Sequence, residues 1–443
     1  MDTSPALPAP EQFVTWLRAV APYIHAFRGK TFVVAFPGEL VMAGRLNALV
    51  QDIGLLHAMG MRIVVVHGSR PQINEQLRLR GVPERYENGL RITDPVALEC
   101  AKEASGEMRL DIEAAFSQGM PNTPMAHSAI RVVSGNLVSA RPVGIVDGID
   151  YEHTGLVRKV DTQTIQFALN GGAIALLSNL GFSATGEAFN LGMEDVAASA
   201  AVALDAEKLI FVTETPGILD EDGEVISEVS EDSAEHLLSS PGRLPTDGAL
   251  YLRAALRACQ GGVARAHIIP FDMDGSVLLE LFQHSGVGTM VVEETLEELR
   301  EAGPDDVGGI LALIRPLEED GTLVRRDRTL IEREVENFTV LERDGVLFGC
   351  AALYAYPEEG IGEMACLAVN PNSQGKGDGE RVLTRIEKRA RAAGLKRLFV
   401  LTTRTMHWFL KRGFVVAGID ALPQEKRNLY NWQRRSVVLL KNL

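Results

Sequence analysis

Short apolar runs alternate with longer amphipathic stretches through the first two thirds of the chain. Thr31–Phe36 and Arg62–His67 are rich in β-branched and aromatic residues, which is typical of buried strands. Before them, Glu11–Ala26 repeats its apolar residues at the spacing of a helix. That apolar side needs a partner surface, either in the same domain or on another subunit. Strands that alternate with helices across short linkers predict an α/β domain with a parallel sheet covered by helices.

The last third of the chain follows a different pattern, in which strands follow one another more closely. An Asp344-Gly345 pair between two β-rich runs predicts a hairpin, and a helix is expected over about Glu380–Ala393. The expected strands are Phe338–Arg343, Val346–Tyr354, Gly362–Val369, Arg397–Thr402 and Arg434–Leu440. This order predicts a smaller α+β domain.

An acidic stretch separates the two patterns. Glu293–Asp306 contains Gly303-Pro304 and is expected to be a short, mainly helical connector. A chain of 443 residues is also long for one domain. We therefore predict a first domain over residues 1–293, a linker over 294–306 and a second domain over 307–443.

The composition argues against a membrane protein, an exported protein and a metal-binding protein. Apolar runs stay shorter than the ~18 residues of a membrane span, and the acidic, proline-containing N-terminus differs from an export signal. The four cysteines stand without metal-ligand spacing, which suits buried thiols in a reducing compartment. We expect a cytoplasmic protein without a metal site and without a membrane partner.

The charge is distributed unevenly along the chain. The net charge is −15, yet residues 371–443 carry 16 Lys and Arg against 5 Asp and Glu. A local basic excess in an acidic protein suits a small polyanionic ligand, although a solvated basic helix face would look the same. Basic residues interleaved with aromatics are not found, so we expect no nucleic acid partner.

Cys366–Arg381 contains the most specific motif of the chain. A strand ends near Val369 and leads through a glycine-rich loop into a helix. Such a loop brings backbone N–H groups and the positive end of the helix dipole to a phosphate. Its Gln-x-x-Gly-x-Gly spacing resembles the pyrophosphate loop of the GCN5-related N-acetyltransferases, which hold acetyl-CoA; the alternative is an ordinary glycine-rich turn. The resemblance assigns to acetyl-CoA the positions Leu367, Ala368, Val369, Gln374, Gly375, Lys376, Gly377, Asp378, Gly379 and Glu380.

The same resemblance implies acid–base residues for acetyl transfer to an amine. The matching glutamate of the family is the general base, which is Glu363 here, although a solvent-facing edge-strand glutamate would look the same. Thr402 stands where related enzymes often carry serine, so it is the candidate acid that protonates the CoA sulfur. Thr403 and Thr405 are alternatives for that acid.

The first domain resembles the acetylglutamate kinase branch of the amino acid kinase family. That branch carries a lysine and two glycines after the first strand and His-Gly-Gly-Gly-Pro after the second. Here Ala35 and Pro37 replace the lysine and a glycine, and the second motif is His67-Gly68-Ser69-Arg70-Pro71. Without the lysine charge and the open glycine turns, the stabilisation that phosphoryl transfer needs is missing. The resemblance therefore implies a kinase fold with a vestigial kinase site.

Part of the same domain resembles the region that binds arginine in arginine-inhibited members of that family. Glu280 suits a guanidinium group, because a carboxylate accepts two charge-assisted hydrogen bonds from it. Taken alone, Glu280 would also fit a solvated helix face. The resemblance assigns an allosteric arginine site to Tyr23, Lys208, His267, Glu280, Gly286 and Gly288.

The combination of a degenerate amino acid kinase domain with an acetyltransferase domain is similar to the N-acetylglutamate synthase family. The resemblance covers nearly the whole chain. It implies transfer of acetyl from acetyl-CoA to L-glutamate, the first step of arginine biosynthesis, with L-arginine as feedback inhibitor. It also implies a homo-oligomer, such as a hexameric ring or a dimer of dimers. It assigns the glutamate site to Arg315, Cys366, Arg434 and Ser436.

Three points stay open from the sequence. If Arg434–Leu440 is extended, Arg435 points to the opposite face from Arg434 and stays outside the site. A bifunctional enzyme would keep acetylglutamate kinase activity, against which Ala35 argues. A non-catalytic sensor of arginine and CoA would have lost the acetyl-transfer chemistry, against which Glu363 argues.

Overall fold

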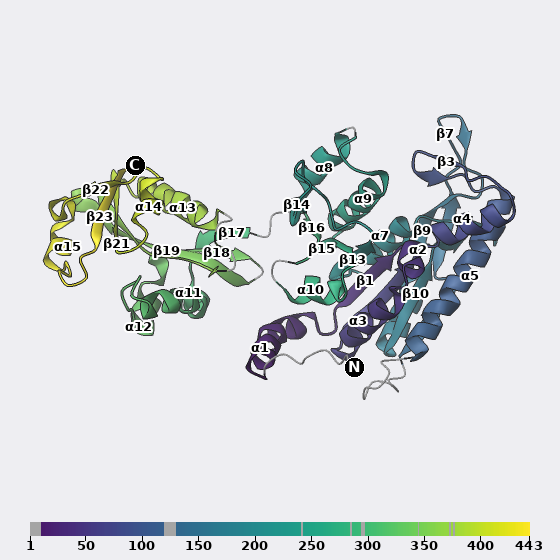
Figure 1. Ribbon diagram of the computed structural model, residues 1–443, viewed down its shortest axis with the longest axis horizontal. Helices are drawn as coiled ribbons and strands as arrows, with labels where there is room; N and C mark the ends of the chain where they lie inside the picture. The colour runs from purple at the N-terminus through teal and green to yellow at the C-terminus, as the bar shows by residue number, and fades with distance from the viewer. Residues whose placement is uncertain are drawn as a thin grey trace, which may run out of the picture. The chain divides into compact units, whose positions relative to one another are not determined.

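The computed structural model describes residues 10–118, 130–240, 242–283, 286–293, 297–343, 345–371, 374 and 377–443. The chain divides into two compact units, Met1–Glu294 and Thr295–Leu443. In each unit, helices pack on a central sheet (Figure 1). Within the described ranges, no helix has both the length and the apolar character needed to cross a membrane.

An eight-stranded sheet, counted over the described residues, is the centre of the first unit. Its order is β14-β16-β15-β13-β1-β2-β10-β5, and β15 with β16 is the antiparallel pair in an otherwise parallel sheet. The strands are β1 (Thr31–Phe36), β2 (Arg62–His67), β5 (Arg131–Ser134), β10 (Ala173–Ser178), β13 (Lys208–Thr213), β14 (Glu228–Ser230), β15 (Arg265–Pro270) and β16 (Thr289–Val292).

Helices bury both faces of this sheet. Val33 and Ala35 of β1 belong to one core, and Phe32, Val34 and Phe36 belong to the core on the other face. Full burial of a large apolar side chain stabilises the fold by roughly 1.5–3 kcal/mol, which explains the continuous apolar runs. The first core includes α6 (Thr162–Asn170), α7 (Met193–Ala203) and α9 (Thr246–Gln260); the second includes α1 (Pro10–Phe27), α3 (Leu46–Ala58), α5 (Pro95–Gln118) and α10 (Ser276–Phe282).

Smaller elements complete the first unit. A four-stranded sheet has the order β12-β11-β6-β9 in the part of the chain that is described. Its strands are β6 (Val138–Pro142), β9 (Gly155–Val160), β11 (Leu180–Phe182) and β12 (Ala188–Asn190). The remaining elements are α2 (Gly38–Met42), α4 (Arg70–Leu79), α8 (Glu231–Ser239) and the short hairpin strands β3 (Tyr86–Glu87), β4 (Leu90–Arg91), β7 (Ile145–Val146) and β8 (Ile149–Asp150).

A seven-stranded sheet, again counted over the described residues, is the centre of the second unit. Its order is β17-β18-β19-β20-β21-β23-β22, and β20 with β21 is the parallel pair among antiparallel ones. The strands are β17 (Glu297–Glu301), β18 (Phe338–Arg343), β19 (Val346–Tyr356), β20 (Ile361–Val369), β21 (Arg397–Thr402), β22 (Val415–Ala417) and β23 (Val437–Asn442).

Two helices cover opposite faces of the second sheet. Val382 and Ile386 of α13 pack in one core, and Ile310 and Ile314 of α11 pack in the other. The helices of this unit are α11 (Val307–Glu319), α12 (Arg328–Arg333), α13 (Asp378–Ala392), α14 (Met406–Leu410) and α15 (Gln424–Asn428), with 3-10 turns at Pro304–Asp306, Val335–Asn337, Pro357–Glu359 and Ile419–Ala421. The predicted α/β first domain and α+β second domain are confirmed.

The expected helical connector is wrong, because Glu297–Glu301 forms β17. This strand pairs antiparallel with β18, and Leu299 stands opposite Leu341. Arg300 pairs with both Asp306 and Glu342, which ties the segment to the second sheet. The acidic composition favours a helix locally, but pairing with an available sheet edge overrides that preference.

The predicted closing strand begins later than expected. β23 starts at Val437, and Arg435 before it has a positive φ of 51°. The Tyr430 hydroxyl donates a hydrogen bond of 2.6 Å to the Ser436 carbonyl, which closes a turn. The alternation argument that separated Arg434 from Arg435 therefore does not apply, because neither residue is in a strand.

Candidate active site

Glu363 lies in the interior of the second sheet. On β20 it stands opposite Tyr354 of β19 and Phe399 of β21, and the residue is 5% exposed. Its Oε2 atom is 2.7 Å from Nζ of Lys426 on α15. Burying a carboxylate is costly unless a charged or hydrogen-bonding partner lies beside it, and Lys426 is that charged partner. Glu363 is therefore a buried residue of a central strand and not a solvent-facing residue of an edge strand.

The two central strands separate directly after Glu363. In the described residues β20 pairs with β21 only over Ile361–Glu363, although β20 continues to Val369. A bulge follows, because one residue of β19 stands opposite two of β20, and Cys366 has a positive φ of 54°. Beyond Glu363, the edge of β20 that contains the predicted positions Leu367, Ala368 and Val369 no longer pairs with β21. A bulge beside a splayed strand pair leaves backbone N–H groups without strand partners, so they can donate to a ligand.

The glycine-rich loop leads into α13, as the sequence predicts. Gly377 has a φ of 91°, which favours glycine, and α13 begins at the next residue. Gly375 and Lys376 lie outside the described residues. Gln374 lines a cavity together with Val369 and residues of α11. The loop therefore delivers the start of a 15-residue helix beside the unpaired part of β20.

The acidic residues of this motif make contacts of their own. Asp378 is buried and lies 2.6 Å from Arg343, while the exposed Glu380 lies 3.1 Å from Arg412. A side chain at Gly379 would place its Cβ 3.2 Å from the Trp408 ring. Asp378 and Gly379 therefore shape the start of α13, and their carboxylate and backbone are fixed by protein contacts.

Thr402 ends β21 with a buried hydroxyl. Its Oγ1 accepts the backbone N–H of Thr405 at 3.0 Å and lies 2.8 Å from the Thr405 hydroxyl. A hydroxyl that already accepts a hydrogen bond has its own proton free to donate. The structure thus places two of the three candidate threonines within hydrogen-bond distance of each other, and either hydroxyl can be the donor.

Arg326 is a site residue that the sequence prediction missed. Its guanidinium contacts the sulfur of Cys366 and lies 5.9 Å from the ring centroid of Tyr354. The predicted Arg315 is exposed on α11 and lines the same cavity as Arg326. Arg326 directly precedes Asp327, the N-cap of α12. The basic run RRDR at residues 325–328 is the sequence feature that could have pointed to it.

Arg434 and Ser436 lie in the turn before β23. The Arg434 guanidinium donates to the carbonyls of Gly321 at 3.2 Å and Thr322 at 2.5 Å. It therefore reaches the segment that leads to Arg326, whereas Ser436 contributes its carbonyl to Tyr430. Burial raises the pKa of the Cys366 thiol to about 11, so the thiol stays protonated at neutral pH.

The predicted arginine-site residues of the first unit form a buried chain of contacts. Lys208 Nζ lies 3.2 Å from His267 Nε2, and His267 Nδ1 lies 2.6 Å from Glu280 Oε1. The other carboxylate oxygen accepts the backbone N–H groups of Val287 at 2.6 Å and Gly288 at 3.2 Å. Burial lowers the pKa of His267 to about 4, so the neutral ring donates through Nδ1 and accepts from Lys208.

Hydrogen bonds offset the cost of burying charge along the Lys208–His267–Glu280 contacts. Burial alone would raise the pKa of Glu280, but the hydrogen bonds from His267 and from the two backbone groups lower it to about 2. Burial lowers the pKa of Lys208 to about 7. The Lys208 ammonium also lies 5.4 Å from the Phe27 ring, which is 6.2 Å from the Tyr23 ring. Tyr23 thus borders the chain through Phe27 rather than touching Glu280.

The two predicted glycines have no room for a side chain. A Cβ at Gly286 would lie 2.5 Å from Glu280 Oε2, and one at Gly288 would lie 2.2 Å from the Ile268 carbonyl. Gly286 also has a positive φ of 57°. The turn can therefore wrap closely around the carboxylate only because both positions are glycine.

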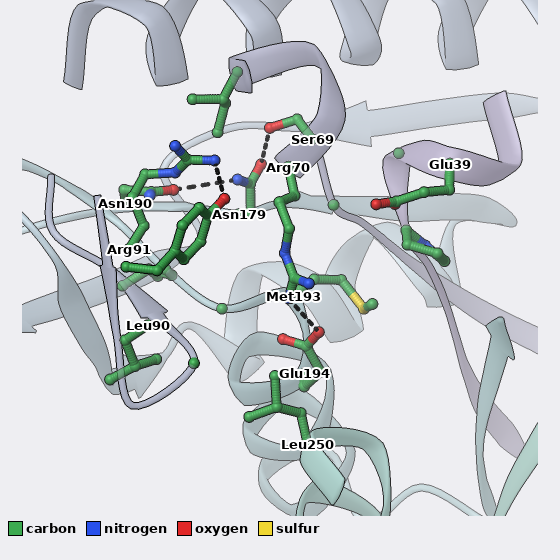
Figure 2. Close-up of a pocket in the computed structure, with 18 of the residues that line it drawn as sticks. Glu39, Ser69, Arg70, Leu90, Arg91, Asn179, Asn190, Met193, Glu194 and Leu250 are labelled. Atoms are coloured by element: carbon green, nitrogen blue, oxygen red, sulfur yellow. Dashed lines mark hydrogen bonds and ion pairs between the residues drawn. The ribbon is translucent and has the colours of Figure 1, made fainter. Parts of the chain in front are cut away.

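The first unit also contains a pocket lined by residues that follow β1 and β2, among them Glu39, Ser69 and Arg70, together with Glu194 at the start of α7 (Figure 2). Arg70 lies 2.6 Å from Asp247 and 3.8 Å from Glu194, while Ser69 donates to Asn179 at 3.0 Å. Burial raises the pKa of both Glu39 and Glu194. The pocket wall thus carries the carboxylates of Glu39, Glu194 and Glu214 beside the guanidinium groups of Arg70 and Arg91. In the described residues, His, Cys, Asp and Glu side chains do not gather into a group of three that could hold a metal ion.

Comparison with known proteins gives matches to both units. The amino acid kinase family model matches residues 30–270, and the acetyltransferase (GNAT) family model matches residues 310–414. An amino-acid acetyltransferase of Ralstonia nicotianae is 65% identical over 444 residues, covering 100% of this chain and 98% of the relative. An amino-acid acetyltransferase of Pseudomonas fluorescens is 50% identical over 433 residues, covering 98% of this chain and 100% of the relative.

Solved structures match over the same length. N-acetylglutamate synthase from Neisseria gonorrhoeae, complexed with coenzyme A and L-arginine, has a TM-score of 0.86 and 40% identity, covering 97% of this chain and 99% of that one. The same synthase complexed with coenzyme A and N-acetyl-glutamate has a TM-score of 0.63 at the same identity and coverage. The chain therefore belongs to the amino-acid acetyltransferases of the N-acetylglutamate synthase type, in which an amino acid kinase-type unit is joined to a GNAT unit.

Proposed function

We propose that this enzyme transfers the acetyl group of acetyl-CoA to the α-amine of L-glutamate, giving N-acetyl-L-glutamate and CoA, the first step of arginine biosynthesis. The observation that carries the proposal is the buried Glu363 carboxylate at the point where β20 and β21 separate. The complex of the gonococcal relative with coenzyme A and N-acetyl-glutamate supports this pair of ligands.

Each step of the transfer has a residue in this site. Glu363 takes a proton from the substrate ammonium, directly or through water, and the free amine attacks the thioester carbon. A backbone N–H of Leu367 or Ala368 stabilises the negative charge that develops on the carbonyl oxygen. The C–S bond then breaks, and Thr402, whose hydroxyl lies 2.8 Å from that of Thr405, supplies a proton to the leaving sulfur. The nitrogen loses its second proton in the same step, which restores the Thr402 hydroxyl, and the proton held by Glu363 passes to solvent. The products are an amide and a free thiol.

The ligand charges fit the charges of the second unit. The N-terminus of α13 and the basic excess of residues 371–443 suit the pyrophosphate of CoA. L-glutamate carries two carboxylates, and planar guanidinium groups bind carboxylates with two hydrogen bonds. Arg326 contacts Cys366 within the sheet and Arg434 reaches the neighbouring segment, so these two bind the substrate more directly than the exposed Arg315.

The substrate assignment is tested by thiol release from acetyl-CoA with a panel of amines. L-glutamate should be the preferred acceptor over L-aspartate, L-glutamine and L-arginine, and Arg326→Met should raise KM for L-glutamate about 10- to 100-fold. Arg333→Met, which changes an exposed arginine on α12, should leave KM unchanged. Preference for another amine, or a normal KM in the Arg326 variant, would contradict the assignment.

We also propose that L-arginine inhibits the enzyme by binding at the Glu280 chain of contacts. The guanidinium would replace existing hydrogen bonds of the carboxylate, and the gonococcal relative has been solved with L-arginine bound. This site and the acetyl-transfer site are in different units. Inhibition therefore requires two conformations of the protein, with L-arginine binding preferentially to the less active one.

The enzyme is further proposed to be a homo-oligomer, such as a hexameric ring, assembled in part through α1. Phe13, Trp16 and Leu17 of α1 are 50%, 50% and 46% exposed, which leaves an apolar stripe without cover within the described residues. Sedimentation analysis of the Trp16→Glu variant should show a smaller assembly than the unaltered chain. An unchanged mass would remove α1 from the subunit interface.

A further inference from the structure

One charged residue beside Glu363 has no role in the transfer chemistry described above. Lys426 Nζ lies 2.7 Å from Glu363 Oε2, with side-chain exposures of 27% for the lysine and 6% for the glutamate. Ion pairs on the surface contribute little, but a pair with one buried member fixes both geometry and charge. Lys426 comes from α15, far from Glu363 in the sequence, so the fold brings the pair together.

The segment that carries Lys426 is fixed to the sheet at several points. Leu422 belongs to a small core with Ile361 and Phe399, the neighbours of Glu363 along β20 and across on β21. The backbone N–H of Gln424 donates to the Glu359 carboxylate at 3.0 Å, which anchors the start of α15 to the turn before β20. Packing and hydrogen bonding therefore fix the position of α15, and with it the position of Lys426 beside the carboxylate.

The same segment continues into the substrate-binding turn. Tyr430 belongs to the periphery of that small core, and its hydroxyl donates to the Ser436 carbonyl at 2.6 Å. Arg434 lies within this turn. Residues 422–436 thus form one strap that holds Lys426 on the base at one end and Arg434 at the other.

Other groups that face Glu363 do not replace Lys426. Arg326 is near enough to interact electrostatically, but its guanidinium contacts the sulfur of Cys366. Tyr354 and Tyr356 on β19 and Cys366 on β20 are neutral at pH 7, because burial raises the pKa of each of these three groups. Among the described residues, Lys426 is the cation within ion-pair distance of the Glu363 carboxylate.

We propose that Lys426 is a positioning residue, whose ammonium group beside the buried Glu363 carboxylate keeps that carboxylate in place to take the proton of the substrate amine. This inference rests on the proposed function, in which Glu363 is the general base. Without the ammonium, burial would favour the protonated carboxylic acid, and a protonated glutamate cannot take the proton of the amine. The enzyme would then need a higher pH to become active.

The test compares pH profiles of kcat/KM for L-glutamate from about pH 6 to about pH 10, measured as thiol release. Lys426→Met should move the acidic limb of the profile upward by about one pH unit or more, with the rate at high pH returning to within about threefold of the unaltered enzyme. Lys426→Arg should restore the original limb. Lys441→Met is the matched control, because Lys441 forms a similar 2.6 Å pair with Glu387 away from the site.

Two outcomes would overturn the inference. An acidic limb in Lys426→Met at its original pH would show that the lysine does not set the charge of the base. A uniform loss of rate that high pH does not restore would show that the lysine has a structural role. Glu363→Gln, measured alongside, separates this from the proposed function: if that variant keeps its rate, the base assignment itself fails, and if it loses its rate, only the role of Lys426 is in question.

Discussion

Each unit contains a few buried polar side chains whose charge depends on pH. Glu363 pairs with Lys426, Glu280 accepts from His267, and the buried His67 lies 2.9 Å from the Ser178 hydroxyl. Each of these groups depends on a particular protonation state, because the interior penalises charge without a partner. Stability and activity should therefore respond to pH through a few identifiable side chains.

His67 provides a pH prediction at this scale. Burial lowers its pKa from 6.5 to about 4, and its ring has no exposed surface. Between those values the unfolded chain binds a proton that the folded chain excludes, so stability is lost as pH falls from 6.5 toward 4. His67→Gln should reduce the loss of unfolding free energy between pH 7 and pH 5 by about 2 kcal/mol.

Denaturant unfolding of the full chain at the two pH values measures this effect. His25→Gln on the exposed side of α1 is the control and should lose as much stability on acidification as the unaltered chain. An equal loss in the His67 variant would mean that the folded protein admits the proton at this position.

At the scale of elements, the bulge of β20 connects the sheet to the chemistry. Cys366 takes a positive φ of 54° there, and Cys350 donates its thiol proton to the Cys366 carbonyl at 3.6 Å. The bulge interrupts the pairing of β20 with β19 shortly after β20 and β21 separate at Glu363, and the pairing with β19 resumes at Ala368. The backbone conformation at Cys366, rather than its thiol, should therefore matter for acetyl transfer.

Substitution at Cys366 separates these two contributions. A β-branched residue is strained at positive φ by roughly 1–3 kcal/mol, so Cys366→Val should lower kcat at least about tenfold. Cys366→Gly keeps the conformation and removes the thiol, and we expect it to stay within about threefold of the unaltered rate. Steady-state thiol release measures both variants. Equal losses in the two would assign the role to the sulfur.

Much of the fold follows from local patterns, and the exceptions have a physical cause. The runs Thr31–Phe36, Arg62–His67 and Arg397–Thr402 form strands with the predicted bounds, because continuous burial leaves few alternatives. Glu297–Glu301 was predicted wrongly because its strand exists only by pairing with β18. Likewise, the turn before β23 is closed by a hydrogen bond between the Tyr430 side chain and the Ser436 carbonyl, which the pattern of apolar residues does not reveal.

Candidate site residues likewise could be predicted from the sequence only where a local motif contains them. A motif fixes Glu363 and the start of α13 along the chain, so a resemblance can point to them. Arg326 contacts Cys366 and Lys426 contacts Glu363, both on β20, but each comes from a different part of the chain. Their spacing in the sequence does not indicate that they are close in the fold. Tertiary contacts of this kind become visible only in the folded chain.

At the scale of the whole molecule, the proposed function places acetyl transfer in the second unit and inhibition by L-arginine in the first. Glu280→Gln should keep the acetyl-transfer rate and raise the L-arginine concentration for half-inhibition by about tenfold or more, since a charged partner of the guanidinium is lost. Rates measured with increasing L-arginine test this. Glu235→Gln, which changes an exposed glutamate of α8, is the control. Unaltered inhibition in the Glu280 variant would place the arginine site elsewhere.

The central claim is that this enzyme acetylates L-glutamate with Glu363 as the base. The most direct measurement is the initial rate of thiol release from acetyl-CoA with L-glutamate, for the unaltered enzyme and for Glu363→Gln in parallel. We predict release that depends on L-glutamate in the unaltered enzyme and a rate about 10²–10⁴-fold lower in the variant. Release that does not depend on L-glutamate, or equal rates in the two proteins, would contradict the account.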